Sequence, residues 1–419
     1  MRAAWIVYLC SAVCAGQAPP DSRARFERAK QLLQLGNYES AASEFSDLLN
    51  AAPDSPLLYN LLGFCYLKQS RLDKAAENFR HAIALKPDFK AAHNNLGGVY
   101  VLEGNVAKAV DEFAAVLKMD PQDTSVRKVV FDLAQAVFRK QDYATAIQLL
   151  ELGKPSMAPS APWHEMMGYA SYKTGDTRRA VAEIQKAMDL DPRNQDYILE
   201  LSEVFVANNN GAASITLLNA AKTQFPNSAR IWFALGVAYL VDENPTAAEG
   251  ALRKSLDLDS KLDLALEVLG QGYKDAGEWR ALLQTANQLI HVNAGNPAGY
   301  YYKAVALIES SSTDDEQIES LLKKSVTLRA EDPGPHYELA KLLAKKGDKD
   351  AAVKELDQIV KAHPDFGPAY YQLYRLYRER KDVAKSQEAQ QAHARIQAKE
   401  REQTARKLLL EVRQRGGGL

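Results

Sequence analysis

A period of 34 residues runs along almost the whole chain, and this repetition constrains the fold more than any other feature. Leu62-Gly63 is followed 34 residues later by Leu96-Gly97, and Tyr66 is followed by Tyr100 at the same distance. A fixed period of this length is typical of proteins in which one small supersecondary unit stacks on the next. Eleven units are predicted, near residues 22–55, 56–89, 90–123, 127–160, 161–194, 195–228, 229–262, 263–296, 297–332, 333–366 and from 367–381 onward.

The spacing inside each unit predicts two helices. When a unit is numbered from 1 to 34, apolar residues at positions 4, 7, 8 and 11 form one helical stripe, and those at 20, 24 and 27 form a second. Small residues at positions 8 and 20, such as Gly63 and Ala75, let the two backbones approach closely. Five glycines are expected after the first helix with a positive φ angle, and six prolines are expected to end the second. These residues are Gly36, Gly104, Gly175, Gly277 and Gly347, and Pro53, Pro87, Pro121, Pro192, Pro226 and Pro364.

The pattern resembles the tetratricopeptide repeat, whose signature has a large residue at position 4, Leu-Gly at 7–8, Tyr at 11, Ala at 20, Phe at 24, Ala at 27 and Pro at 32. The resemblance implies an all-α fold, a right-handed α-solenoid superhelix of helix-turn-helix units over residues 19–381. The charged segment 382–415 lacks proline and glycine and is predicted to be a long helix that caps the stack. Residues 416–419 are predicted to be a flexible tail. A coiled-coil contact through the long helix is the alternative.

The first eighteen residues differ from the rest and predict export. Arg2 precedes an apolar run from Ala3 to Val13, which has the length of a signal-peptide core and is too short to span a bilayer. Residues 1–18 are therefore predicted to be a signal peptide and short leader, and the protein to be periplasmic or secreted. A buried N-terminal helix is the alternative. Cys14 also ends a segment that resembles a bacterial lipobox, so lipidation at this cysteine is a further possibility, although Val13 replaces the expected small residue.

The charge balance and the absence of catalytic motifs exclude several function classes. The chain has 52 Lys and Arg against 53 Asp and Glu, whereas a nucleic-acid-binding protein normally carries a basic excess. We therefore expect no nucleic-acid partner, and no later segment is apolar enough to span a membrane. The glycines follow the repeat period, and the seven histidines lack the spacing of a zinc motif. No cofactor or metal is expected, and Cys65 is expected to be an inert thiol.

The candidate binding residues follow from the resemblance, which implies that positions 2, 5, 9 and 12 of the first helices line a concave groove. Aromatic residues recur at these positions, which the packing of the helices does not require, and exposed aromatic and Arg side chains suit an extended peptide or a partner helix. A clamp for a partner's C-terminal carboxylate is incomplete, because Asn95 matches it but Phe64 and Asp132 do not. The predicted groove residues are Asn60, Phe64, Asn94, Tyr169, Tyr172, Phe233, Val237, Leu240, Tyr301, Ile308, Tyr337, Tyr371 and Arg375.

These observations favour a non-enzymatic scaffold that binds other proteins outside the cytoplasm. Only the leader and the C-terminal helix lie outside the repeats, whereas a catalytic domain needs about 100 residues or more. Two alternatives stay open. One is a lipid-anchored assembly factor of the bacterial envelope, of the pilus or outer-membrane biogenesis type. The other is a repeat subunit of polysaccharide export, in which the aromatic rings would contact sugars.

Overall fold

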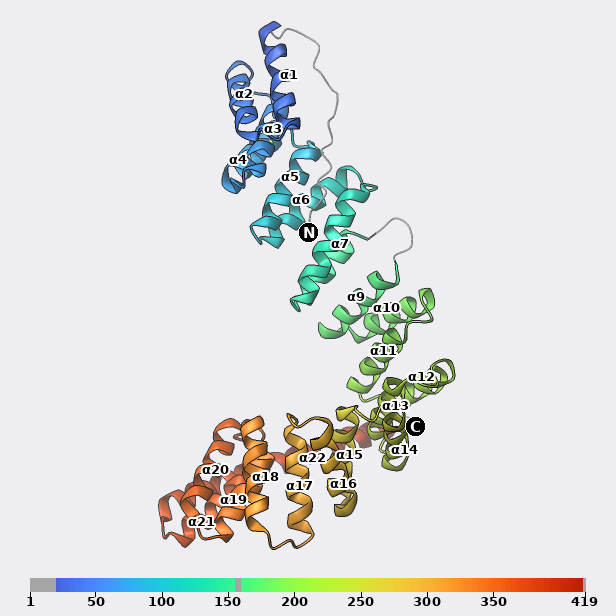
Figure 1. Cartoon of the computed structure of the whole chain (residues 1–419), viewed down its shortest axis with the longest axis vertical. Coiled ribbons are helices and arrows are strands. Elements are labelled where there is room, and N and C mark those ends of the chain that lie inside the picture. Colours follow the sequence, from blue (N-terminus) through green and yellow to red (C-terminus); the bar gives the residue numbers. More distant parts are fainter. Residues whose placement is uncertain (1–19, 155–159, 417–419) are drawn as a thin grey trace. The chain divides into compact units, whose positions relative to one another are not determined.

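The computed structural model describes residues 20–154 and 160–416, and this part of the chain contains twenty-two α-helices that form eleven consecutive hairpins (Figure 1). The predicted signal peptide 1–18 and Cys14 lie outside the described residues. The helices are α1 (Pro20–Gln34), α2 (Tyr38–Ala51), α3 (Pro56–Lys68), α4 (Leu72–Leu85), α5 (Lys90–Leu102), α6 (Val106–Met119), α7 (Thr124–Arg139), α8 (Tyr143–Leu152), α9 (Ala161–Lys173), α10 (Thr177–Leu190), α11 (Gln195–Ala207), α12 (Gly211–Gln224), α13 (Ala229–Val241), α14 (Pro245–Leu258), α15 (Asp263–Ala276), α16 (Trp279–Val292), α17 (Pro297–Glu309), α18 (Asp315–Leu328), α19 (Pro333–Lys345), α20 (Lys349–Ala362), α21 (Gly367–Glu379) and α22 (Val383–Gly416).

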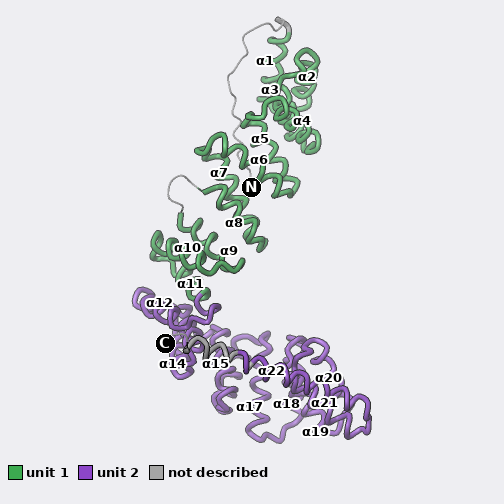
Figure 2. The backbone as a smooth tube through the Cα atoms, turned by 180° about the vertical axis from the view of Figure 1, so that it is seen from behind, with its two compact units in different colours: residues 1–204 green, residues 205–419 purple. Residues whose placement is uncertain are grey.

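The helices divide into two compact units, one that ends at Val204 and one that begins at Phe205 (Figure 2). In each unit most helices pack against the next one along the chain, as α3 does against α4 and α19 against α20. The first helices of neighbouring repeats also touch, as α3 with α5 and α7 with α9 in the N-terminal unit, and α15, α17, α19 and α21 in the C-terminal unit. The odd-numbered helices therefore share one face in each unit, which we call the first-helix face. This architecture confirms the predicted all-α solenoid.

Glycine at position 8 permits the close crossing of the two helices in a repeat. A Cβ atom on Gly97 would lie 2.7 Å from the ring of Phe113, and one on Gly236 would lie 2.6 Å from Cγ of Leu252. Both contacts are shorter than van der Waals distance, so a larger residue would push the helices apart. Gly63 meets Phe79 in the same way, at 2.8 Å. The bulky residue at position 24 thus fills the space that the glycine leaves.

The turns between the helices confirm the expectation for glycine and extend it. All five predicted glycines have a positive φ, from +72° at Gly277 to +92° at Gly175. Six further repeats place another residue type in the same left-handed conformation, which is strained for a side chain with a Cβ atom. These residues are Ser70, Gln141, Asn209, Glu243, Ser311 and Lys381. Each of the six predicted prolines follows the end of a second helix, as Pro87 follows α4.

Two repeats differ from the expected boundaries. The fourth unit was expected to begin at residue 127, but α7 begins at Thr124, 34 residues after the start of α5 at Lys90. The three additional residues lengthen α7, which has 16 residues where α5 has 13. The long C-terminal helix is the second helix of the last repeat: Ser386 and Ala389 are buried in its first turns, and residues 397–403 are exposed. It includes Gly416, and residues 417–419 of the predicted flexible tail lie outside the described residues.

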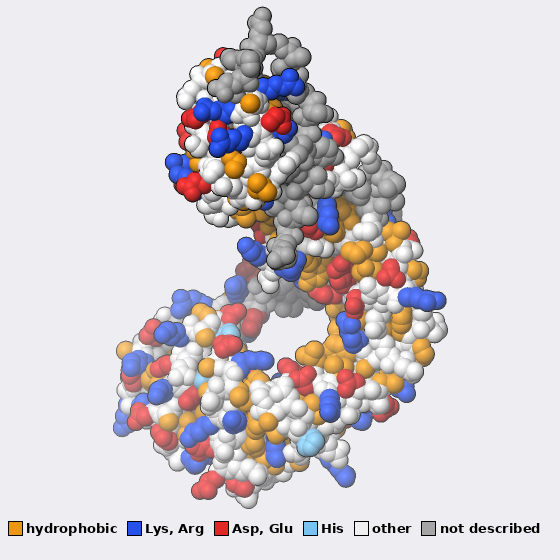
Figure 3. All heavy atoms as spheres, turned by 45° about the horizontal axis from the view of Figure 1, so that its top comes forward, with side chains coloured by type: hydrophobic (Ala, Val, Ile, Leu, Met, Phe, Trp, Pro, Cys, Tyr) orange, Lys and Arg blue, Asp and Glu red, His pale blue; other side chains and the backbone are white. Residues whose placement is uncertain are grey.

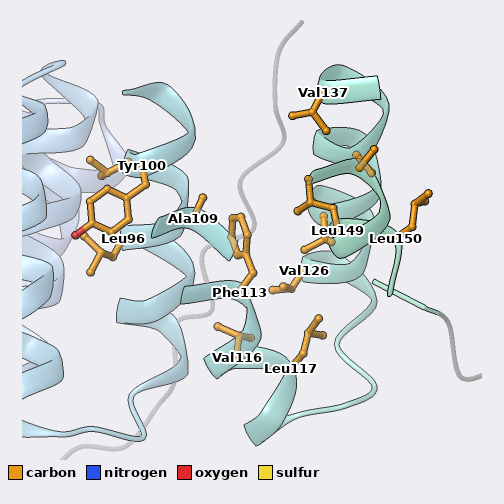
Figure 4. Close-up of a cluster of buried hydrophobic side chains, with 14 of the residues drawn as sticks. Leu96, Tyr100, Ala109, Phe113, Val116, Leu117, Val126, Val137, Leu149 and Leu150 are labelled. Atoms are coloured by element: carbon orange, nitrogen blue, oxygen red, sulfur yellow. The ribbon is translucent and has the colours of Figure 1, made fainter. Parts of the chain in front are cut away.

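The hydrophobic core continues from repeat to repeat within a unit. Figure 4 shows Phe113 of α6 facing the neighbouring hairpin, with Val126 of α7 and Leu149 of α8 on the side toward it. Phe113 and Leu149 have no solvent-exposed surface. Because one hairpin cannot bury both of its apolar faces, each repeat depends on its neighbours for stability.

Candidate protein-binding face

The structure leaves most of the predicted groove residues partly accessible on the first-helix faces and buries two of them. Leu240 and Tyr371 are the most open of the apolar and aromatic ones, with 39% and 46% of their surface exposed. Arg375 is also exposed. The half-buried residues are Asn94, Tyr169, Tyr172, Phe233, Val237, Tyr301, Ile308 and Tyr337.

Asn60 and Phe64 were expected to point into an open groove, and this expectation is wrong. Each has 8% of its surface exposed. The Nδ2 atom of Asn95 on α5 donates a hydrogen bond of 3.0 Å to Oδ1 of Asn60. Phe64 packs in the same core cluster as Phe79 and Leu96. The neighbouring first helix thus covers these positions, and Asn95 is engaged within the fold.

Four aromatic rings gather on the first-helix face of the N-terminal unit. The Tyr169 ring of α9 lies 5.8 Å from Phe138 at the end of α7, 6.1 Å from Tyr143 at the start of α8 and 6.1 Å from Tyr172. The Nζ atom of Lys173 lies 4.4 Å from the centre of the Tyr172 ring and 3.2 Å from a carboxylate oxygen of Glu203. The sequence analysis identified Tyr169 and Tyr172 but missed Phe138, because the lengthening of α7 obscured its position in the repeat.

Two glutamates meet beside this cluster. Glu165 of α9 and Glu200 of α11 form a hydrogen bond through their carboxyl groups, and the Oε2 atom of Glu200 is buried without a hydrogen-bond partner. Burial, together with the charges of Glu165, Asp196 and Glu203, raises the pKa of Glu200 to about 8. Burial also raises the pKa of Glu165. A carboxyl–carboxyl hydrogen bond requires one proton, so the protonated carboxyl of Glu200 donates to Glu165 near neutral pH.

In the C-terminal unit, two predicted tyrosines also contact the next first helix. The ring of Tyr301 lies on Gly334 of α19, where an added Cβ atom would be 3.0 Å from the tyrosine Cζ. Burial raises the pKa of Tyr301 above its usual range. The Nε2 atom of Gln372 on α21 donates to Oη of Tyr337 at 3.4 Å. These aromatic residues therefore do contribute to packing between repeats, contrary to the expectation that packing does not require them.

Helix α21, the first helix of the last repeat, carries the most exposed group of aromatic and basic side chains. Tyr371 lies 6.4 Å from Tyr374 on α21 and 5.6 Å from His393 on α22, measured between ring centres. Arg378 donates from Nη1 to Oη of Tyr374 at 3.0 Å. Arg375 lies one helical turn after Tyr371. Exposed tyrosine and arginine side chains of this kind commonly dominate the binding energy of protein interfaces.

The histidines at position 4 have a structural role that the sequence analysis did not identify. The Nδ1 atom of His336 lies 2.5 Å from Oε2 of Glu355, and its Nε2 atom lies 2.9 Å from the carbonyl oxygen of Ala330. Both partners accept, so the imidazolium form satisfies both, and the bond to Glu355 raises the pKa of His336. The pairs His93–Glu112 and His164–Glu183 each have a distance of 2.6 Å and the same separation of 19 residues. The recurring separation of 19 residues between His and Glu is the sequence feature from which these pairs could have been predicted.

Neither a metal centre nor a membrane span is found among the described residues. No three His, Cys, Asp or Glu side chains among them are grouped to hold a metal ion, and none of their helices combines the length and hydrophobicity needed to cross a membrane. Burial raises the pKa of Cys65 to about 12, which fits an unreactive thiol. Two open depressions of about 380 and 400 Å³ lie on the second helices α20 and α16. Basic and acidic side chains are interspersed on the surface in view in Figure 3.

The helical hairpins and their stacked first helices define an α-solenoid, a class of protein that generally serves as a binding scaffold. Family models described as "Tetratricopeptide repeat" match residues 26–88, 65–124, 172–238 and 316–377, which together make up more than half of the chain. The chain therefore belongs to the tetratricopeptide repeat family. Comparison with curated proteins finds no match.

The solved structures to which this chain is similar are distant in sequence. Yeast Tom70 is 15% identical, with a TM-score of 0.44, and the alignment covers 92% of this chain and 96% of that one. The tetratricopeptide repeat domain of P58(IPK) is 16% identical, with a TM-score of 0.37, and covers 86% and 99%. The Cut9–Hcn1 hetero-tetramer of APC/C is 16% identical, with a TM-score of 0.42, and covers 90% and 81%.

Proposed function

We propose that this protein is a non-enzymatic scaffold that binds an extended peptide or a partner helix on its first-helix faces. The observation that carries the proposal is the set of accessible aromatic, aliphatic and arginine side chains on those faces, from Tyr169 and Leu240 to Tyr371 and Arg375. A row of parallel helices presents such side chains at regular intervals, which suits an elongated ligand.

Site-specific photo-crosslinking tests where partners bind. A photoreactive amino acid replaces Leu240 or Tyr371 on the first-helix faces, and Lys254 on α14 serves as an exposed control on a second helix. The full-length protein is expressed in its native host, and crosslinked proteins are identified by mass spectrometry. The proposal predicts specific products at Leu240 or Tyr371 that are absent at Lys254. Specific products at Lys254 alone would contradict it.

We further propose that the scaffold acts outside the cytoplasm, as a periplasmic or secreted protein. The support is the apolar run from Ala3 to Val13 after Arg2. Cell fractionation and N-terminal sequencing of the mature protein test this, and a chain that retains Met1 in the cytoplasm would refute it. Metabolic labelling with a fatty acid, compared between wild type and Cys14→Ala, tests the lipid-anchored alternative. Label that disappears in the variant supports lipidation, and its absence from the wild type excludes it.

A further inference from the structure

The C-terminal unit ends in a cluster of rings and cations that we call the α21 cluster, composed of Tyr371, Tyr374, Arg375 and Arg378 of α21 with Tyr337 and Lys341 of α19. Its side chains are ordered by one another. The guanidinium carbon of Arg378 lies 5.6 Å from the centre of the Tyr374 ring, and Nζ of Lys341 lies 5.5 Å from the centre of the Tyr337 ring. The cluster is therefore an ordered surface in which positively charged side chains lie next to aromatic rings.

The two arginines of this cluster differ from the cations around them in whether they form ion pairs. On the neighbouring surface, Lys345 binds Asp315 at 3.0 Å, Lys349 binds Glu379 at 2.8 Å and Arg380 binds Asp350 at 2.7 Å. Arg375 and Arg378 form no ion pair with any carboxylate among the described residues.

Lys341 does have a carboxylate partner, because its Nζ atom lies 2.8 Å from Oε2 of Glu338. The three cations of the cluster thus face two carboxylates on its own two helices, Glu338 and Glu379. The pKa of Glu379 is lowered by its bond to Lys349 and also by the charge of Arg375, and its ion pair is with Lys349. An arginine without an internal partner can offer its planar fork to a carboxylate from another molecule, with two parallel hydrogen bonds.

The exposed ring of Tyr371 packs against His393 of α22. The Nδ1 atom of His393 on α22 donates to the carbonyl oxygen of Gly367 at 3.0 Å, which fixes the imidazole 5.6 Å from the ring of Tyr371. Tyr371 nevertheless keeps 46% of its surface exposed. A ring that is already fixed loses little conformational entropy when a partner covers it, so it is well suited to anchor an apolar side chain.

The positive charge of this surface indicates which class of partner it would bind. We propose that an extended acidic segment with interspersed aromatic or aliphatic side chains docks across α19 and α21, with its carboxylates on Arg375, Arg378 and Lys341 and an apolar side chain on Tyr371. This inference rests on the proposed scaffold function and gives it a partner class. The first-helix face of the N-terminal unit carries the carboxylates of Glu165 and Glu203 instead, and Lys173 there is already paired with Glu203, so the same segment is not expected to bind there.

Fluorescence anisotropy with the full-length protein tests the partner class. The probes are fluorescein-labelled peptides of about ten residues, which reach about 33 Å when extended. Glu and Asp alternate with Phe and Leu in the first peptide, Gln replaces the acids in the second, and Lys replaces them in the third. The acidic peptide is expected to bind most tightly, and its affinity is expected to fall as salt rises, because exposed ion pairs are screened.

Charge reversal locates the site. Arg375→Glu combined with Arg378→Glu is expected to weaken the acidic peptide by about tenfold or more, because it replaces attraction with repulsion at two contacts. The matched control, Arg329→Glu combined with Lys361→Glu, makes the same change in net charge at two exposed residues, one directly after α18 and one on α20. It is expected to change the affinity by less than about twofold. Circular dichroism checks that both variants remain folded.

The results separate the two proposals. Equal binding of the acidic and neutral peptides, or an unchanged affinity in the double variant of α21, would overturn the acidic-partner inference. If natural partners still crosslink at Tyr371 or Leu240 in that case, the scaffold function stands without it. If no partner crosslinks at Leu240 or Tyr371 while one does so at Lys254, the scaffold proposal fails as well.

Discussion

Replacing Glu200 with glutamine is expected to stabilise the N-terminal unit at alkaline pH. In the folded protein Glu200 holds a proton to which the Glu165 carboxylate is hydrogen-bonded, and its pKa is about 8 instead of 4.5. The unfolded chain releases that proton near the ordinary glutamate pKa. Because the folded-state pKa is the higher one, the contribution of this group to stability is complete below about pH 4.5 and is lost as the pH rises to about 8.

The magnitude follows from that interval. Between the two pKa values each pH unit removes about 1.4 kcal/mol of unfolding free energy. From about pH 5 to about pH 8 the wild type should therefore lose up to about 4 kcal/mol through this group. Glutamine has nearly the same shape as a protonated glutamate, donates to Glu165 from its amide and does not titrate. Glu200→Gln should thus match the wild type near pH 5 and exceed its stability by about 2–4 kcal/mol near pH 8.

Urea unfolding followed by far-UV circular dichroism at several pH values measures this difference. Glu77→Gln on the exposed surface of α4 controls for the loss of one negative charge. A parallel fall in stability for wild type and Glu200→Gln between pH 5 and pH 8 would refute the reasoning, because it would show that Glu200 is ionised in the folded protein throughout.

Four further substitutions test the packing and the turns by thermal and urea unfolding. Leu235→Ala should lower stability by about 2–5 kcal/mol, because the side chain is buried, and half-buried Phe233→Ala should lower it less; the reverse order would mean that the helix faces are misassigned. Gly236→Ala should lower stability by about 1–3 kcal/mol by pressing on Leu252, and an unchanged melting temperature would argue against a tight crossing. Glu243→Gly should raise stability by about 0.5–1 kcal/mol by relieving a left-handed backbone, and a loss of stability would contradict that view.

The helices could be predicted from the sequence because local residues set their limits. Gly104 permits the left-handed turn after α5, and Pro121 follows the end of α6. The lengthening of α7 could not be placed in the same way. Three added residues are close to one helical turn, so the helix can grow while its apolar face stays in register. Ala134 is fully buried in a register that begins at residue 127, although the helix itself begins at Thr124.

The candidate site was harder to predict, because the openness of a first-helix position depends on the side chain that the next repeat presents. Phe64 and Tyr371 both lie on the face that the resemblance assigns to binding. Phe64 is covered by the core that α4 and α5 share, whereas Tyr371 lies on α21, the last of the first helices among the described residues. The 34-residue period alone predicts that both positions are exposed. Only the residues that pack around each position explain why one is buried and the other is open.

One recurrent contact between repeats explains why Glu200 holds its proton. Position 5 of one repeat meets position 6 of the next, 35 residues later, as Asn60 meets Asn95 and Tyr337 meets Gln372. In both pairs an amide group donates and an oxygen accepts, so the contact is satisfied at any pH near neutral. Glu165 and Glu200 occupy the same two positions, and two carboxylates can only accept. Burial raises the pKa of both carboxyl groups, so the pair meets the hydrogen-bonding requirement of the position by retaining a proton. Glu200→Gln would supply the amide donor that the other repeats already have at this contact.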